Sequence, residues 1–254
     1  MNRGRYILEH LKSKFDKSRF DRTTDKWYYF LHIPKTAGTT FRYTLYNYFD
    51  QAEIYPNYFE LMVCQRSEYF DWKEYRDREP QLFSQKKRLL IGHFGWAPLR
   101  FYKHNKPSTL TFLRDPVNRV KSAILYNQQR DRKYKDLAID DILDQYAIVE
   151  GTLQARHLGY KAKKDNMQRA LENLESIDFI GIAEQFDRSL VLCNHTLGWN
   201  LEAIPKRNVG SNTDNSFSPE HIAKIESACE LDYIIYRRGV ELFNERFKSN
   251  KLTI

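Results

Sequence analysis

Residues 30–41 read Phe30-Leu31-His32-Ile33-Pro34-Lys35-Thr36-Ala37-Gly38-Thr39-Thr40-Phe41. An apolar run, a turn with one lysine, one glycine and three threonines, and then a helical pattern predict a buried strand that enters a helix through a tight turn. Backbone N–H groups at a helix N-terminus lack intrahelical partners and lie at the positive end of the macrodipole, so anions bind there. The turn is therefore predicted to hold a phosphate or sulfate group.

The order of the lysine and the glycine in this turn is unusual. In the common ATP- and GTP-binding loop, a first glycine is followed by four residues and then by Gly-Lys-Ser/Thr. Here Lys35 comes before Gly38. An ordinary ATP or GTP loop is therefore disfavoured, and a kinase of the P-loop type remains only as an alternative.

A second strand-to-helix junction occupies residues 109–122 and reads Thr109-Leu110-Thr111-Phe112-Leu113-Arg114-Asp115-Pro116-Val117-Asn118-Arg119-Val120-Lys121-Ser122. Asp115 is a good N-cap, and Pro116 suits the first helical position. Arg114 then lies at the carboxyl end of the strand, and Ser122 shares a helix face with Asp115 because of its seven-residue spacing. An arginine can donate two parallel hydrogen bonds to a phosphate, so this junction is predicted to be a second anion site.

Short apolar strands alternate with helical segments along the chain, which predicts an α/β fold with three layers, P-loop-like, in which helices flank a central, mainly parallel sheet. Ligands of such sheets bind outside the carboxyl ends of the strands, where both anion motifs fall. We expect one domain over residues 1–254, with a basic helical extension at residues 1–25, and a helix plus a loop over the site within residues 53–80. The other expected strands cover 26–33, 88–93 and 178–182, and the expected helices cover 38–49, 117–129, 138–149, 166–174, 184–197 and two segments between Ser218 and Phe247.

The composition is that of a folded protein with a basic surface. Of the 254 residues, 41% are hydrophobic and 15% are aromatic, and 41 Lys and Arg against 33 Asp and Glu give a formal charge of +8. This excess suits an anionic ligand such as a nucleotide or an acidic glycan. A nucleic-acid partner is not expected, because the chain has no zinc-finger spacing, no aromatic RNA-binding signature and no basic tail.

Three widely spaced cysteines, Cys64, Cys193 and Cys229, are typical of a reducing compartment. No pair of them has metal-ligand spacing, so no metal is expected. No apolar run reaches the roughly 18 residues of a membrane span, and the charged N-terminus has no apolar signal region. A cytoplasmic location is therefore the prediction.

Both motifs resemble those of the sulfotransferases that use 3′-phosphoadenosine 5′-phosphosulfate. Residues 33–40 are similar to the family's 5′-phosphosulfate loop, and residues 113–122 are similar to its 3′-phosphate motif. The branch with heparan sulfate 2-O-sulfotransferases and related carbohydrate enzymes is the most similar. Weaker likeness continues through 179–186 and 232–247, so it covers most of the chain from about residue 25 onward. Membrane-anchored members of that branch carry an N-terminal span, so this chain looks more like a soluble bacterial relative, or like a shortened form of an anchored one.

The resemblance implies a sulfuryl transfer from this nucleotide to an acceptor hydroxyl, with carbohydrate as the preferred acceptor class. Lys35 would contact the bridging and sulfate oxygens, and Arg114 and Ser122 would hold the 3′-phosphate. A loop at residues 207–211, with Asn208 and Gly210, is similar to a family segment that closes over the nucleotide. The 5′-phosphosulfate would be held by Lys35, Thr36, Ala37, Gly38, Thr39 and Thr40. A non-catalytic nucleotide- or glycan-binding protein on the same scaffold is the remaining alternative.

A general base must remove the acceptor proton, and His93 in Ile91-Gly92-His93-Phe94 is the predicted base. It closes a predicted strand, so it should face the same crevice as the two anion loops, and histidine has a pKa near neutrality. A Gly-His at a comparable place serves this role in the similar glycan enzymes. A hydrogen-bonded structural histidine is the competing interpretation.

Other candidate residues are weaker. His32 precedes the loop on a buried strand and is predicted to be structural, whereas His104 and His157 have polar neighbours and are predicted to lie at the surface. Glu53 is a minor alternative as base. Arg119 is equally compatible with a structural ion pair and with ligand binding.

Overall fold

The central element is a five-stranded sheet with the strand order β2-β3-β1-β4-β5, in which every paired strand is parallel to its neighbour. The computed structural model describes residues 26–57, 72, 87–102, 106–164, 166–202 and 217–253. Phe30 of β1 pairs with Ile91 of β3 and with Leu110 of β4. The strands are β1 (Tyr28–Leu31), β2 (Ile54–Tyr55), β3 (Leu89–Gly92), β4 (Ser108–Leu113) and β5 (Phe179–Ile182).

The strand order changes direction between β1 and β4. The chain leaves β1 toward β2 on one side of the sheet, and it leaves β4 toward β5 on the other side. In open parallel sheets such a point leaves a crevice at the carboxyl ends of the two strands, where ligands bind. The two predicted anion loops follow β1 and β4, so the topology brings both to this crevice.

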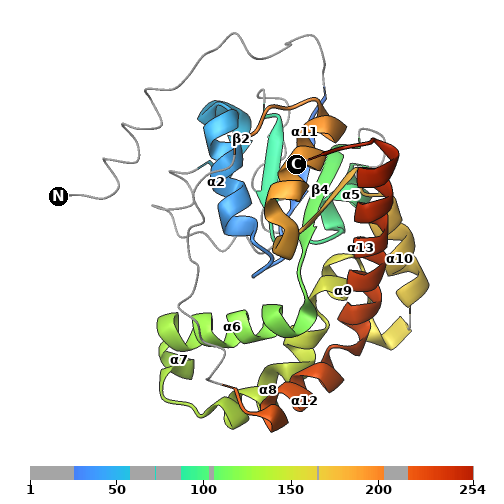
Figure 1. The fold of residues 1–254 in the computed structure, drawn as a ribbon. Helices are drawn as coiled ribbons and strands as arrows, with labels where there is room; N and C mark the ends of the chain where they lie inside the picture. The colour runs from blue at the N-terminus through green and yellow to red at the C-terminus, as the bar shows by residue number, and fades with distance from the viewer. Residues whose placement is uncertain are drawn as a thin grey trace, which may run out of the picture.

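Helices cover both faces of the sheet and extend beyond one end of it (Figure 1). The α-helices are α2 (Gly38–Tyr48), α5 (Ala97–Phe101), α6 (Pro116–Arg130), α7 (Arg132–Lys135), α8 (Ile139–Gly151), α9 (Leu153–His157), α10 (Met167–Glu175), α11 (Phe186–Leu197), α12 (Pro219–Ala228) and α13 (Glu230–Ser249). Short 3-10 helices are η2 (Gln51–Glu53), η5 (Ala162–Lys164) and η6 (Ala183–Gln185). The fold is thus three-layered α/β with a parallel sheet, as predicted.

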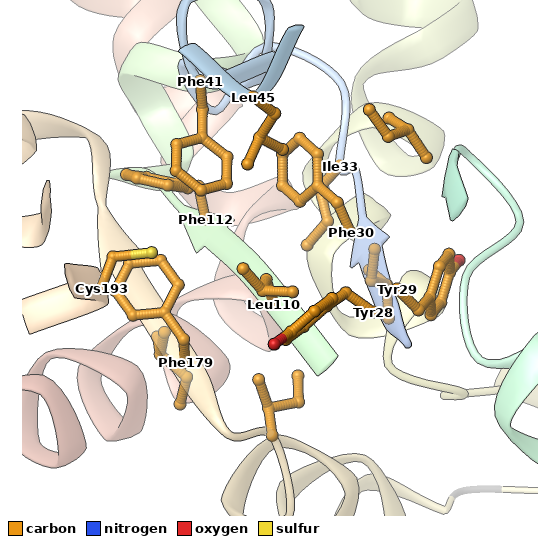
Figure 2. Close-up of a cluster of buried hydrophobic side chains, with 14 of the residues drawn as sticks. Tyr28, Tyr29, Phe30, Ile33, Phe41, Leu45, Leu110, Phe112, Phe179 and Cys193 are labelled. Carbon is orange, nitrogen blue, oxygen red and sulfur yellow. The ribbon is translucent and has the colours of Figure 1, made fainter. Parts of the chain in front are cut away.

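Aromatic side chains fill the core between the sheet and helices α2 and α11. Phe41 of α2 lies edge-on to Phe30 of β1, with ring centroids 5.0 Å apart, and its centroid is 4.8 Å from that of Phe112 of β4. Figure 2 shows these rings together with Phe179 and Cys193. All five side chains are fully buried. Burial of such large rings fixes α2, and therefore the loop at its N-terminus, against the sheet.

Helix α13 packs on the opposite face of the sheet, where Gly239 permits a close approach. A Cβ atom at Gly239 would lie 2.2 Å from Leu113 Cδ1 of β4. A larger residue would push α13 away from the strand that carries the second motif.

A second apolar cluster joins α6, α8 and α12, which lie together beyond the carboxyl ends of the strands (Figure 1). Its fully buried members include Ile124 of α6, Leu143 of α8 and Ile225 of α12. Because α6 begins directly after β4, this cluster fixes the direction in which α6 leaves the sheet.

The structure refines the predicted elements at their ends and adds short ones. The first strand is shorter than the predicted 26–33: it covers only Tyr28–Leu31, and the turn follows from Pro34. The short strand β2 and the helices α5 and α9 were not predicted. Most of the segment predicted to cover the site, and all of residues 1–25, lie outside the described residues, and the single-domain organisation stays a prediction.

Candidate functional site

The first predicted anion loop has the backbone shape of an anion-binding turn. Lys35 and Ala37 adopt positive φ angles of 68° and 64°, whereas Thr36 between them does not. A positive φ angle costs a residue other than glycine about 1–2 kcal/mol, and backbone strain of this kind is frequent at functional sites. Left-handed residues within a turn can direct neighbouring N–H groups toward one concave side, which suits an anion.

The N-terminus of α2 has no side-chain cap. Its N-cap residue is Ala37, and the first intrahelical bond runs from Phe41 N to the Ala37 oxygen at 3.1 Å. The N–H groups of Gly38, Thr39 and Thr40 therefore precede the regular helical ladder and are the groups that an anion could accept from.

The Thr36 hydroxyl is engaged inside the protein. It donates to the Ile33 carbonyl oxygen at 2.9 Å, and the residue is fully buried. The backbone N–H of Thr36, rather than its hydroxyl, is thus the group that the loop could present. Thr40 is also largely buried, whereas Thr39 is partly exposed.

The packing around residue 38 requires a glycine, which the sequence alone did not reveal. A Cβ atom at this position would lie 1.9 Å from His32 Nε2, so only a glycine allows the helix to start directly over the imidazole ring of His32. His32 is buried, as predicted for a structural residue, and stacks on Phe30 with centroids 5.2 Å apart.

The second loop forms as predicted at the start of α6. Asp115 is the N-cap, its carboxylate accepts from Asn118 N at 2.9 Å, and Pro116 occupies the first turn. Arg114 precedes the cap directly, and β4 runs straight into α6 (Figure 1).

The two loops touch each other. Arg114 Nη1 donates to the Lys35 carbonyl oxygen at 3.1 Å, although 79 residues separate them in sequence. The remaining contact of the guanidinium with an acid is loose: Arg114 Nε is 3.9 Å from Glu184 Oε1, which already accepts from Asp115 N at 3.1 Å. Arg114 is therefore partly buried beside the first loop with much of its donor capacity still available, and burial lowers the pKa of its guanidinium.

A bound anion would stabilise the charged form of the Lys35 amine. Burial, and next the positive charge of Arg114, lower the pKa of Lys35 to about 8. Its Nζ atom lies over the ring of Tyr126, 4.0 Å from the centroid, which is a cation–π contact. An anion placed beside Lys35 would favour the charged amine and raise this pKa.

One face of α6 borders the Lys35 loop. Ser122, Tyr126 and Arg130 follow each other at four-residue spacing, so they share this face. The Arg130 guanidinium carbon is 5.4 Å from the centroid of the same Tyr126 ring, which is 44% exposed. The role of Ser122 stays a prediction, whereas the contacts of Tyr126 with Lys35 and with Arg130 were not predicted, although the spacing from Ser122 could have indicated them.

His93 follows β3, the neighbour of β1, and lies beside His32. Its ring centroid is 4.4 Å from that of His32, and Nδ1 lies 2.7 Å from the His32 carbonyl oxygen. Because a carbonyl only accepts, Nδ1 carries the proton in the neutral ring and Nε2 is the basic nitrogen. Burial, and next the charge of His157, lower the pKa of His93 to about 3, so the ring is neutral at pH 7.

His157 is partly buried rather than a surface residue, so that prediction was wrong. Its Nδ1 donates to the Leu153 carbonyl oxygen at 2.9 Å, and its Nε2 atom is inaccessible to solvent. Burial lowers the pKa of His157 to about 4. The short helix α9, which the sequence pattern did not reveal, turns this histidine inward.

Arg119 and Glu53 serve the fold. The Arg119 side chain is fully buried, and its Nη1 is 3.1 Å from Glu150 Oε2. Glu53 accepts from Asp50 N at 3.3 Å and pairs with Arg88 at 3.5 Å, so it closes the cap of η2. Besides burial, the charge of Arg119 nevertheless contributes to the lowered pKa of both Lys35 and Arg114.

Several predicted residues lie outside the described part of the chain, namely Asn208, Gly210, the rest of the 207–211 loop, His104 and Cys64. No cluster of His, Cys, Asp or Glu side chains suited to a metal ion occurs within the described ranges. Among the helices formed by these residues, none is long and apolar enough to cross a membrane.

Comparison with solved structures finds distant likenesses. No family model and no curated protein matches the chain. A crystal structure of a sulfotransferase from Alicyclobacillus acidocaldarius is similar with a TM-score of 0.38 and 18% identity, over 79% of this chain and 94% of that chain. Values this low do not establish a shared activity, and they do not favour the heparan sulfate 2-O branch.

Proposed function

We propose that this chain is a sulfotransferase that uses 3′-phosphoadenosine 5′-phosphosulfate to sulfate a hydroxyl group. The observation that carries the proposal is the hydrogen bond from Arg114 Nη1 to the Lys35 carbonyl oxygen, because it joins two anion-binding loops at one sheet edge. A ligand that engages both loops needs two separated anionic groups. A nucleotide with phosphates at both its 5′ and 3′ positions meets this requirement.

The order of the loop residues favours sulfuryl transfer over a kinase reaction. Lys35 precedes Gly38, and the second anion site at Arg114 and Ser122 has no counterpart in the Gly-x-x-x-x-Gly-Lys-Ser/Thr pattern. An ATP-dependent kinase would have no 3′-phosphate for Arg114 to hold. The P-loop-type kinase is therefore the less favoured alternative.

The donor supplies an activated sulfuryl group, and the chain's own residues position it and stabilise charge. Lys35 and the N–H groups of Gly38 and Thr39 would hold the 5′-phosphosulfate, with further help from Thr36, Ala37 and Thr40. Lys35 would donate to the oxygen that leaves with the phosphate, where negative charge develops as the sulfur–oxygen bond breaks. Arg114 and Ser122 would hold the 3′-phosphate. Fixed donors of this kind act without reorganisation during the reaction.

His93 is proposed as the base that takes the acceptor proton. As the acceptor oxygen forms its bond to sulfur, its hydroxyl proton passes to His93 Nε2, and the 3′,5′-bisphosphate leaves. The Nδ1 bond to the His32 carbonyl holds the ring in the tautomer that this step requires. The low pKa keeps the ring unprotonated at neutral pH but makes it a weak base, so it would accept the proton late, when the acceptor oxygen has become acidic.

Carbohydrate is the proposed acceptor class, in a cytoplasmic setting. The acceptor class follows from the motif resemblance, and the net charge of +8 allows an acidic glycan but does not select one. Peptide tyrosine, lipid-linked sugars and small alcohols are the alternative acceptor classes, which the transfer experiment described next distinguishes.

The test has two arms. In the first, isothermal titration compares 3′-phosphoadenosine 5′-phosphate with ATP. We expect the bisphosphate to bind and ATP to bind at least about tenfold more weakly, since it lacks one anchored phosphate; tighter binding of ATP would favour the kinase. In the second, labelled sulfate donor is incubated with glycans, tyrosine peptides and small alcohols. Nucleotide binding without transfer to any class would favour a non-catalytic binding protein.

A further inference from the structure

Gln154 of α9 forms a pair of hydrogen bonds with the backbone of Arg114. Its Oε1 accepts from Arg114 N at 3.1 Å, and its Nε2 donates to the Arg114 carbonyl oxygen at 2.9 Å. The Gln154 side chain is fully buried. One amide thus satisfies both polar backbone groups of the residue that the second anion loop presents.

These two backbone groups have no partner in a strand or helix. β4 ends at Leu113, its ladder with β5 ends at the pair Leu113 and Ile182, and α6 begins only at Pro116. Buried backbone groups need partners, and an amide side chain can supply a donor and an acceptor at once. Gln154 therefore continues the strand-like bonding by one residue and fixes where Arg114 points.

Gln154 is itself held by a buried carboxylate. Asp232 of α13 accepts from Gln154 N at 3.0 Å and from Ala155 N at 2.8 Å, so it anchors the first turn of α9. Asp232 also lies 4.0 Å from Arg119 Nε, and Arg119 belongs to α6. The chain of contacts therefore runs from α13 through α9 to the Arg114 turn and returns to α6.

We propose that Gln154 is a positioning residue for donor binding, which acts through Arg114; this inference rests on the proposed function. Because Arg114 Nη1 also donates to the Lys35 carbonyl oxygen, a shift of the Arg114 backbone would disturb both anion loops. The affinity for the bisphosphate nucleotide should fall more than the turnover of the saturated enzyme, since Gln154 touches neither the sulfuryl group nor the acceptor.

The chain contains a matched control for this amide. Asn194 of α11 forms the same pair of bonds with Leu201: its Oδ1 accepts from Leu201 N at 2.7 Å, and its Nδ2 donates to the Leu201 oxygen at 3.0 Å. Leu201 follows α11 and belongs to neither anion loop. Loss of the Asn194 amide should therefore lower stability without changing nucleotide affinity.

The experiment titrates 3′-phosphoadenosine 5′-phosphate into the wild type, Gln154→Met and Asn194→Leu, with thermal unfolding as the measure of stability. We expect Gln154→Met to raise the Kd of the bisphosphate about tenfold, because two hydrogen bonds to the Arg114 backbone are lost. The KM for the donor should rise by a similar factor, and kcat should stay within about twofold of the wild-type value. Asn194→Leu should keep the wild-type Kd. A folded Gln154→Met with unchanged Kd, or an equal rise in Asn194→Leu, would overturn the inference.

A double-mutant comparison separates positioning from general loss of structure. In the Arg114→Ala background, Gln154→Met should cause no further rise in Kd, because its effect passes through the missing guanidinium. Additive losses would overturn the proposal. Should Gln154→Met not fold, Gln154→Asn gives the same measurement, since its amide is one methylene shorter and cannot make both bonds. A wild type that fails to bind the bisphosphate would instead refute the proposed function.

Discussion

The lowered pKa of Lys35 makes nucleotide binding a proton-uptake reaction. With a pKa of about 8 in the free protein, Lys35 is half deprotonated at pH 8. An anion held against the amine should return its pKa toward the usual value near 10.4, so binding draws a proton from the buffer. The uptake should be about 0.1 proton at pH 7, about 0.5 at pH 8 and about 0.9 at pH 9.

The affinity should fall with rising pH, as the proton uptake grows. Only the protonated amine pairs well with the anion, so the free protein must first be protonated at high pH. The linkage predicts a Kd for 3′-phosphoadenosine 5′-phosphate that is about tenfold higher at pH 9 than at pH 7. The phosphates of the ligand do not contribute at pH 8 to 9, because their second pKa is about 6.

Calorimetry in buffers of different ionisation enthalpy measures the uptake directly, since the observed heat varies with buffer in proportion to the protons transferred. The matched control is Lys35→Arg, which keeps a positive charge that does not titrate in this range. We expect a slope of about half a proton at pH 8 in the wild type and no slope in Lys35→Arg. Heats that do not depend on the buffer in the wild type, or equal slopes in both proteins, would refute the placement of Lys35 beside the anion.

Three further substitutions test individual residues. Arg114→Ala should weaken bisphosphate binding by about 1.5–3 kcal/mol, the usual range for a hydrogen bond to a charged group, and an unchanged affinity in titration would remove its assigned role. His93→Ala should lose turnover but keep nucleotide binding, and wild-type turnover of this variant would exclude His93 as the base. Because the pKa of His93 is about 3, the pH–rate profile of the wild type should show no histidine limb at pH 6–7. Gly38→Ala should lower the free energy of unfolding by about 1–3 kcal/mol in denaturant, because the new Cβ atom would overlap the His32 ring. The added change His32→Ala should recover part of this loss. A Gly38→Ala protein of wild-type stability would contradict the packing.

The strand-turn-helix units could be predicted because their signals are local. The apolar run before Lys35 is followed within about a dozen residues by the turn that opens α2, and the Asp115-Pro116 pair supplies the cap of α6 directly after its strand. The order of these units along the chain also predicted a parallel sheet.

The contacts that build the site depend on residues far apart in sequence and could not be predicted from it. The bonds from Arg114 to the Lys35 carbonyl and from Gln154 to the Arg114 backbone span 79 and 40 residues. His157 was misplaced for a different reason. Its polar neighbours indicated a surface position, and α9 is only five residues long, so it gives no periodicity from which the orientation of this side chain could be recognised.

The central proposal is that two loops hold two anionic groups of one adenosine nucleotide. Titration of the wild-type protein with adenosine 3′,5′-bisphosphate and with adenosine 5′-phosphate tests it most directly. We expect the bisphosphate to bind about 10 to 100 times more tightly, because only it engages Arg114 and the Lys35 loop together. Equal affinity of the two nucleotides would contradict the proposal.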